Sequence, residues 1–192
     1  MNIDKTIKKV EKYTQKHVKK SRFEHCKRVA AMCVELCRLF NIDEKKGYLC
    51  GIGHDMCKDF PDDKMIKLAK KDGLGISDYA KDHVYILHGR AASVKMKDKF
   101  KIKDEDVLQA VSTHVSAEPG MCDLAKILYI SDKAEPGRAF STDEYREKLF
   151  KLSLNDMFIK VLLQSYEYIK KKGWDIYPNT IKTIEYYTGG NK

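Results

Sequence analysis

Apolar residues recur along this chain at the spacing of α-helices. Near the N-terminus they stand at Ile3, Ile7, Val10 and Val18, the pattern of one buried helical face. No segment shows a persuasive alternation of apolar and polar residues, and no strong hairpin signal appears. The pattern therefore predicts an all-α protein, a single-domain helical bundle over residues 1–192.

Capping and helix-breaking residues set the expected helix ends. Ser21 and Glu24 have the spacing of a capping box for a helix that ends near Phe40. Asp43 is expected to cap the next helix, which ends around His54-Asp55. Further helices are expected over 62–71, 84–99, 103–114, 122–133, 142–152, 154–172 and 179–187, with a loop at 75–82.

Composition is that of a soluble globular protein. Of the 192 residues, 43% are hydrophobic and 34% are charged, and no apolar run approaches the roughly 18 residues of a membrane span. The N-terminus lacks the continuous apolar segment of a secretory signal, so we expect a cytoplasmic protein with no membrane partner. The six cysteines form no C-x-x-C pair, which argues against a zinc knuckle, and a chain of this length needs no disulfide framework.

The charge balance indicates an anionic partner. Lysine and arginine total 37 against 28 acidic residues, a formal net charge of +9. Only six of these cations are arginines, the residue on which sequence-specific readers of nucleic acids rely. We therefore expect no specific nucleic-acid partner. Lysines scattered over every helix are typical of a solvated surface, and the charge beyond that fits attraction of a phosphate-rich small molecule.

The stretch C-G-I-G-H-D-M-C-K-D-F, at 50–60, contains an unusual group of polar residues. His54 and Asp55 offer a neutral nitrogen ligand and a carboxylate that can bridge two ions. Lys58 follows Asp55 by three residues, on the same side of a helix, where its ammonium can neutralise phosphate oxygens. A His-Asp dipeptide also occurs by chance at the end of an amphipathic helix, so its meaning depends on the rest of the chain.

Other histidines and carboxylates also stand near the ends of expected helices. Helix ends converge on one side of a bundle more easily than helix centres, and bundles build metal sites from side chains on facing helices. Imidazoles with carboxylates suit iron, manganese, cobalt or zinc better than calcium, which takes only oxygen ligands. We therefore predict a metal site made of His25, His54, Asp55, His88, His114 and Asp132.

The order of these residues resembles the H…HD…D metal motif of the HD phosphohydrolase superfamily. Shorter segments are similar to the successive motifs of one branch, the YqeK-like symmetrical diadenosine tetraphosphate hydrolases of bacteria. The resemblance makes 22–138 the motif core and 142–187 a set of C-terminal helices. The matching segments are R-F-E-H at 22–25, H-D-M-C-K at 54–58, L-H-G at 87–89, A-V-S-T-H at 110–114 and S-D-K-A-E-P-G-R at 131–138.

This resemblance implies two metal ions in an all-helical fold. Iron is the metal that the family suggests, with manganese, cobalt or zinc as alternatives. Carried over residue by residue, the resemblance gives one ion to His25, His54, Asp55 and Asp132, and a second ion, bridged by Asp55, to His88 and His114.

The reaction that the resemblance implies is hydrolysis of a dinucleoside polyphosphate. Two cations about 3.5–4 Å apart share a hydroxide and polarise a phosphoryl oxygen, and attack of that bridging hydroxide on an inner phosphorus of diadenosine tetraphosphate gives two ADP. Lys58 and Arg138 are the expected catalytic and phosphate-binding cations. Asp59 either orients Lys58 or protonates the leaving oxygen. Arg90 and His83 complete the expected substrate-binding set.

Two other functions are open on the sequence alone. The same ligands would serve an HD-type nucleotidase or phosphodiesterase that acts on another nucleotide. A non-catalytic protein docked on RNA or the ribosome through its basic surface would instead show steeply salt-dependent RNA binding. Aromatic residues near the C-terminus either complete the core or form a homodimer face: Tyr166, Tyr168, Trp174, Tyr177, Tyr186 and Tyr187.

Overall fold

The computed structural model describes residues 2–189, and within that range it contains helices and no strand. The prediction of an all-α fold is confirmed. Two short 3-10 helices, η1 (Lys70–Asp72) and η2 (Val84–Leu87), join longer elements. The α-helices of this range are α1 (Ile3–His17), α2 (Lys20–Leu39), α3 (Glu44–Gly53), α4 (Asp62–Ala69), α5 (Asp78–Asp82), α6 (His88–Phe100), α7 (Glu105–Thr113), α8 (Asp123–Ala134), α9 (Asp143–Leu149), α10 (Leu154–Lys171) and α11 (Pro178–Thr188).

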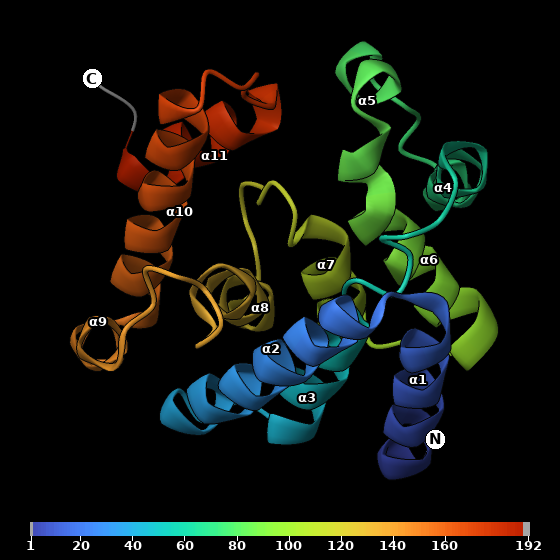
Figure 1. Ribbon diagram of the computed structural model, residues 1–192, viewed down its shortest axis with the longest axis horizontal. Helices are drawn as coiled ribbons and strands as arrows, with labels where there is room; N and C mark the ends of the chain where they lie inside the picture. Colours follow the sequence, from blue (N-terminus) through green and yellow to red (C-terminus); the bar gives the residue numbers. More distant parts are fainter. Residues whose placement is uncertain (1, 190–192) are drawn as a thin grey trace.

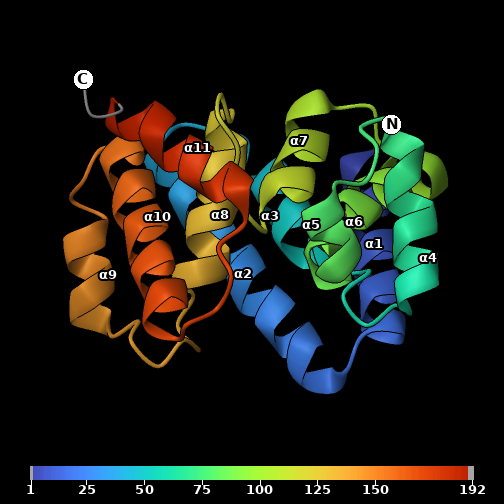
Figure 2. The same cartoon turned by 90° about the horizontal axis from the view of Figure 1, so that it is seen from above.

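The apolar helix α8 is central to the fold. In Figure 1, α9, α10 and α11 lie on one side of it and α1, α4, α5 and α6 on the other, and Figure 2 shows the same division from above. α8 contacts α2, α3, α7 and α10. Its Ile127, Leu128 and Ile130 are fully buried, as expected of a helix that is apolar on most of its surface.

The start of α2 departs from the prediction. Asp43 caps α3 as expected, since its side chain accepts the backbone N–H groups of Lys45 and Lys46. Ser21, however, does not cap α2, which already begins at Lys20. The N-cap residue is Lys19, and its backbone N–H donates to Oδ2 of Asp59 at 2.9 Å. A carboxylate from a distant turn thus stabilises this helix start, where unpaired N–H groups favour negative charge.

Residues 75–100 also differ from the prediction. Where a loop was expected, Ser77 accepts the N–H of Ala80 and caps the short helix α5. The single helix expected over 84–99 is divided into η2 and α6. The change from 3-10 to α geometry falls at His88, so this side chain begins α6 instead of lying within a longer helix.

Helices α2 and α3 approach very closely at Gly51. A Cβ atom on Gly51 would lie only 2.4 Å from the Cα of Ala30, so only glycine fits this contact without displacement. The close packing brings His25 of α2 beside the end of α3, and the rings of His25 and His54 have centroids 5.3 Å apart. The helix contact therefore assembles part of the predicted metal site.

The C-terminal aromatic residues divide between core and surface. Tyr187 packs against the core, and its hydroxyl accepts the backbone N–H of Met121 at 2.9 Å. Tyr168, Trp174 and Tyr186 are more than half exposed, so a homodimer face stays a prediction. Among residues 2–189, no helix combines the length and the hydrophobicity needed to cross a bilayer.

Candidate metal centre

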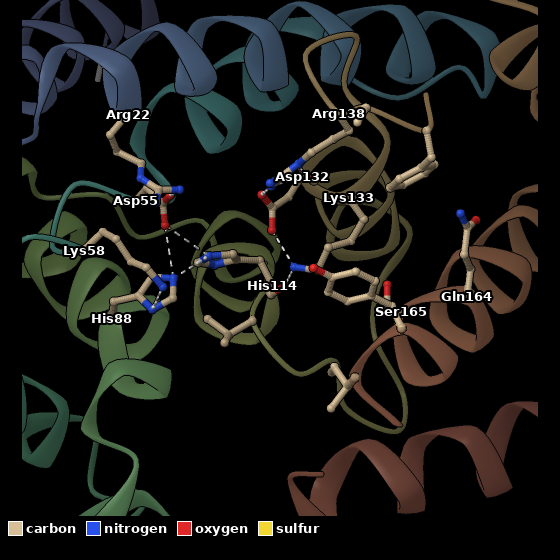
Figure 3. A pocket seen from close by; sticks show the side chains of 15 residues that line it. Arg22, Asp55, Lys58, His88, His114, Asp132, Lys133, Arg138, Gln164 and Ser165 are labelled. Carbon is tan, nitrogen blue, oxygen red and sulfur yellow. Dashed lines mark hydrogen bonds and ion pairs between the residues drawn. The ribbon is translucent and has the colours of Figure 1, made fainter. Parts of the chain in front are cut away.

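The six side chains predicted as metal ligands lie together. None is more than 6% exposed, although the chain between them runs through most of the fold. Figure 3 shows Asp55 and Asp132 directed into the same space as His88 and His114. The six come from separate segments: His25 from α2, His54 and Asp55 from the turn after α3, His88 from the start of α6, His114 from the residue after α7, and Asp132 from the last turn of α8.

Hydrogen bonds fix which ring nitrogen of each histidine faces the cluster. Nδ1 of His54 lies 2.8 Å from the carbonyl oxygen of Gly51. Nδ1 of His88 and of His114 lie 2.6 and 2.7 Å from the carbonyl oxygens of Tyr85 and Val111. Because a carbonyl oxygen only accepts, each Nδ1 carries the proton, and Nε2 of the neutral ring is left with a free lone pair.

The Nε2 atoms converge on the carboxylates, and Asp55 uses a different oxygen toward each pair of rings. Its Oδ1 lies 3.0 Å from Nε2 of His88 and 3.7 Å from Nε2 of His114. Its Oδ2 lies 3.5 Å from Nε2 of His54 and 3.9 Å from Nε2 of His25. Asp132 adds Oδ1 to the second pair, 3.0 Å from His25 and 3.7 Å from His54. Each pair of rings thus faces a different oxygen of the Asp55 carboxylate.

Two features of the cluster are those expected where a cation binds. Nε2 of His54 is buried and has no hydrogen-bond partner among residues 2–189, and a buried polar atom left unpaired is costly. Nε2 of His88 and Nε2 of His114 face one another at 3.1 Å, although both Nδ1 atoms hold the ring protons. Two lone pairs at that distance repel unless a positive ion lies beside both. The donor set of imidazole nitrogens and carboxylate oxygens suits a transition metal.

Burial and charge keep the ligands in the protonation states that metal binding requires. Burial lowers the pKa of His54 to about 4, and it also lowers the pKa values of His88 and His114. Burial alone would raise the pKa of Asp55, but the surrounding imidazoles of His54, His114 and His88 outweigh it and hold that pKa well below its usual value. The pKa of Asp132 is likewise low, because Lys133 and His25 outweigh the effect of burial.

A cavity of about 790 Å³ opens onto the two carboxylates. Four cations line it. Nη1 of Arg22 lies 3.0 Å from Oδ2 of Asp55, and Arg138 and Lys133 both bind the Asp132 carboxylate. Nζ of Lys58 lies 3.3 Å from Nδ1 of His88. Figure 3 shows these cations around the carboxylates and the α10 side chains across the space. The remaining lining residues are His88, His114, Val115, Ala139, Phe140, Gln164, Ser165, Tyr168 and Ile169.

Three of the predicted substrate or catalytic residues lie elsewhere. The guanidinium of Arg90 forms two hydrogen bonds of 2.6 Å with the carboxylate of Asp72, the last residue of η1, so it ties η1 to α6. His83 stacks on Tyr79 with ring centroids 4.1 Å apart. The carboxylate of Asp59 accepts the backbone N–H of Lys19 at the start of α2. None of these three lines the cavity, and their local partners account for their positions.

The sequence analysis missed three residues that contact the cluster. Arg22 and Lys133 bind Asp55 and Asp132 directly, and the buried Glu135 accepts a hydrogen bond from His25. All three lie inside the segments R-F-E-H and S-D-K-A-E-P-G-R, so these motifs held the signal. What the sequence alone could not supply was the direction in which each side chain points.

These observations define a class: an all-α protein with a buried histidine–aspartate cluster below a cationic cavity. The chain belongs to the HD domain family, whose model matches residues 22–137. That finding confirms the resemblance drawn from the motifs.

Named bacterial proteins are similar to this chain over almost its whole length. A protein of Halalkalibacterium halodurans named bis(5'-nucleosyl)-tetraphosphatase, symmetrical, is 30% identical, with 95% of each chain covered. A Bacillus subtilis protein of the same name is 28% identical, with both chains fully covered. A crystal structure from Clostridium acetobutylicum, described as a predicted HD superfamily hydrolase involved in NAD metabolism, has a TM-score of 0.87 and 30% identity and covers 95% of this chain and 96% of its own.

Proposed function

We propose that this chain is a metal-dependent phosphohydrolase that cleaves diadenosine tetraphosphate symmetrically into two ADP. The observation that carries the proposal is the meeting of six buried nitrogen and oxygen ligands with four cationic side chains at one cavity. The names of the two full-length relatives support the choice of a dinucleoside polyphosphate as substrate.

The two oxygens of Asp55 support a centre of two metal ions. A mixed set of imidazoles and carboxylates favours iron, manganese, cobalt or zinc, and we propose iron. When bound, such ions supply Lewis acidity toward a phosphoryl oxygen and make a nucleophile available at neutral pH. The proposed ligand sets are His25, His54, Asp132 and Oδ2 of Asp55 for one ion, and His88, His114 and Oδ1 of Asp55 for the other.

The cations at the cavity are the proposed phosphate ligands. Lys58 and Arg138 keep the role expected from the sequence, and Arg22 and Lys133 join them. Four positive side chains outnumber the two carboxylates of the cluster, so positive charge remains for the substrate. Burial lowers the pKa of Lys58, but the nearby Asp55 carboxylate opposes that shift. Lys58 thus lies in a partly dry site, where charge interactions are stronger.

The proposed reaction exchanges one phosphorus–oxygen bond for another. Water adds to one inner phosphorus, and the oxygen bridge to the other inner phosphorus breaks. The electron pair of the broken bond stays on the oxygen of the departing ADP, the added oxygen stays on the second ADP, and a proton passes to solvent. Lys58 and Arg138 neutralise the negative charge that increases on the phosphoryl oxygens in the transition state.

The cavity also suits the rest of such a substrate. Its volume of about 790 Å³ lies in the range of about 300–1,000 Å³ usual for small-molecule sites. Another part of the cavity wall contains Phe140, Tyr168 and Ile169, which offer apolar and aromatic surface to a nucleoside. We propose that one adenosine lies against this wall while the phosphates face the cations.

Product analysis tests the proposal. The protein is loaded with Fe²⁺ or Mn²⁺, incubated with diadenosine tetraphosphate, and the nucleotides are separated by anion-exchange chromatography. ADP as the only product supports the function, and the Asp55→Ala variant serves as the inactive control. Equal amounts of AMP and ATP would refute symmetrical cleavage. Cleavage of mononucleotides or cyclic dinucleotides in place of this substrate would favour the other HD-type activities.

Two further expectations accompany this function. We propose that residues 1–192 act as one domain, with a motif core at 22–138, and limited proteolysis that releases a stable fragment would contradict that. We also propose a cytoplasmic location, where nucleotide substrates and reduced metal ions are found. Cell fractionation followed by immunodetection checks it.

A further inference from the structure

Glu135 is a buried carboxylate surrounded by hydrogen-bond donors. It is 1% exposed and directly follows the last residue of α8. Its Oε1 lies 3.1 Å from Nδ1 of His25 and 3.1 Å from Nη2 of Arg28. Its Oε2 accepts from Nε of Arg28 at 2.6 Å and from the backbone N–H of Gly137 at 2.5 Å. With four donors around it, the carboxylate is held in one position and stays ionised.

This arrangement separates His25 from the other three histidines of the cluster. His54, His88 and His114 each donate Nδ1–H to a neutral backbone carbonyl. Among the four rings, His25 alone donates to a charged side chain. A carboxylate behind an imidazole fixes the ring and increases the electron density on the opposite nitrogen, which makes that nitrogen a stronger metal ligand.

We propose that Glu135 is a positioning residue that makes the two metal positions unequal. It strengthens the binding of the ion at His25, His54 and Asp132. It does not contact His88 or His114, the ligands of the other ion. This inference rests on the proposed two-metal function. Its consequence is an ordered loading, in which the His25 side binds its ion more tightly and fills first.

The neighbouring residues hold Glu135 in place. Arg28 forms two hydrogen bonds with the carboxylate, and its guanidinium lies directly over Gly137. A Cβ atom on Gly137 would lie 2.5 Å from Nε and Nη2 of Arg28, so the glycine leaves room for this ion pair. The E-P-G-R segment thus supports the cluster in two ways, because Glu135 orients His25 while Arg138 binds Asp132.

Titration of metal-free protein with Mn²⁺ tests the inference in the full-length chain. Bound ions are counted by electron paramagnetic resonance, which also distinguishes a coupled pair of ions from an isolated one. Wild type should bind two Mn²⁺ in two steps and give a coupled spectrum when full. Glu135→Gln should weaken the tighter step by about 10–100-fold and leave the other step unchanged. At a Mn²⁺ concentration that fills only the tighter site of wild type and gives one isolated ion, the variant should therefore hold clearly less than one ion per chain.

Three results would overturn the inference. Two steps of wild-type affinity in Glu135→Gln would show that the carboxylate does not tune His25. An equal weakening of both steps would show general support for the cluster, not selective support. A wild-type chain that binds a single Mn²⁺ would refute the two-metal function itself, a failure distinguishable from the other two because it appears without any substitution.

Two more variants guard against a loss that reflects misfolding. Glu144→Gln changes an exposed carboxylate on α9, and it should reproduce both wild-type steps. Gly137→Ala displaces the Arg28 guanidinium but keeps the carboxylate behind His25, so it should retain two steps, with a smaller weakening of the tighter one. If Gly137→Ala weakened that step as much as Glu135→Gln, the effect would belong to the loop and the assignment to Glu135 would fail.

Discussion

Replacing Gly51 by alanine should push α3 away from α2 and disturb the metal cluster without changing any ligand. The added Cβ would lie 2.4 Å from Cα and 2.6 Å from N of Ala30, whereas ordinary contacts of this kind begin at 3.4 Å. Both atoms belong to a helix backbone and cannot rotate away. The two helices must therefore separate by about 1 Å, because close-packed interiors have little room for adjustment.

The energetic cost follows from that displacement. Overpacking a core costs about 1–3 kcal/mol, and the upper end applies because backbone opposes backbone. Alanine regains about 1 kcal/mol of helix propensity relative to glycine. The net loss of about 2 kcal/mol should lower the melting temperature by about 4–8 °C in a chain of this size. A shift of about 1 Å between His25 and Asp55 should also reduce hydrolysis by about 100-fold.

Circular dichroism melting of metal-free protein and a metal-loaded rate assay measure the two effects. Gly47→Ala is the matched comparison on the same helix, where the Cβ meets Sγ of Cys37 at 2.5 Å, the end of a side chain that can turn. Its loss should be smaller. A melting temperature for Gly51→Ala within 1 °C of wild type, together with full activity, would refute the close α2–α3 contact as the support of the cluster.

The remaining predictions concern the ligands, the cavity and the bound metal. Asp55→Ala should abolish hydrolysis and lower the metal content, and retention of both would exclude a bridging role. Lys58→Ala should reduce kcat by about 10²–10³-fold with metal content unchanged in elemental analysis; an unchanged rate would remove Lys58 from the reaction. Arg90→Ala breaks the pair with Asp72 and should lower the melting temperature while KM stays the same, so a large rise in KM would return Arg90 to the substrate site. Chelation should destabilise the protein by about 2.7 kcal/mol per ion present at a hundred times its Kd, and an unchanged melting curve would speak against metal in the native state.

The sequence was most informative where a local pattern decides the structure. Helical periodicity and the cap at Asp43 indicated most of the helices, because these signals act within a few residues. The predicted cap at Ser21 was wrong because the N–H of Lys19 is instead bound by Asp59, 40 residues away. Such a partner depends on tertiary packing, and no local pattern indicates it.

The same division applies to the cavity. The ligand candidates were recognisable because imidazoles and carboxylates at helix ends are few and chemically distinctive. Cations are abundant in this chain, so their number gave no guide to which of them face the cluster. Arg90 was predicted to bind the phosphates of the substrate, but it forms an ion pair with Asp72. Arg22 and Lys133 were not predicted as site residues, but they form ion pairs with Asp55 and Asp132. Only the packing of α2, α6 and α8 decides these directions.

The most direct test of the central claim is a crystal structure of the metal-loaded protein with anomalous diffraction measured at the absorption edge of the bound metal. Two anomalous peaks should flank the Asp55 carboxylate, one beside His25 and His54 and the other beside His88 and His114. A single peak, or peaks away from Asp55, would contradict a centre of two metals in this fold.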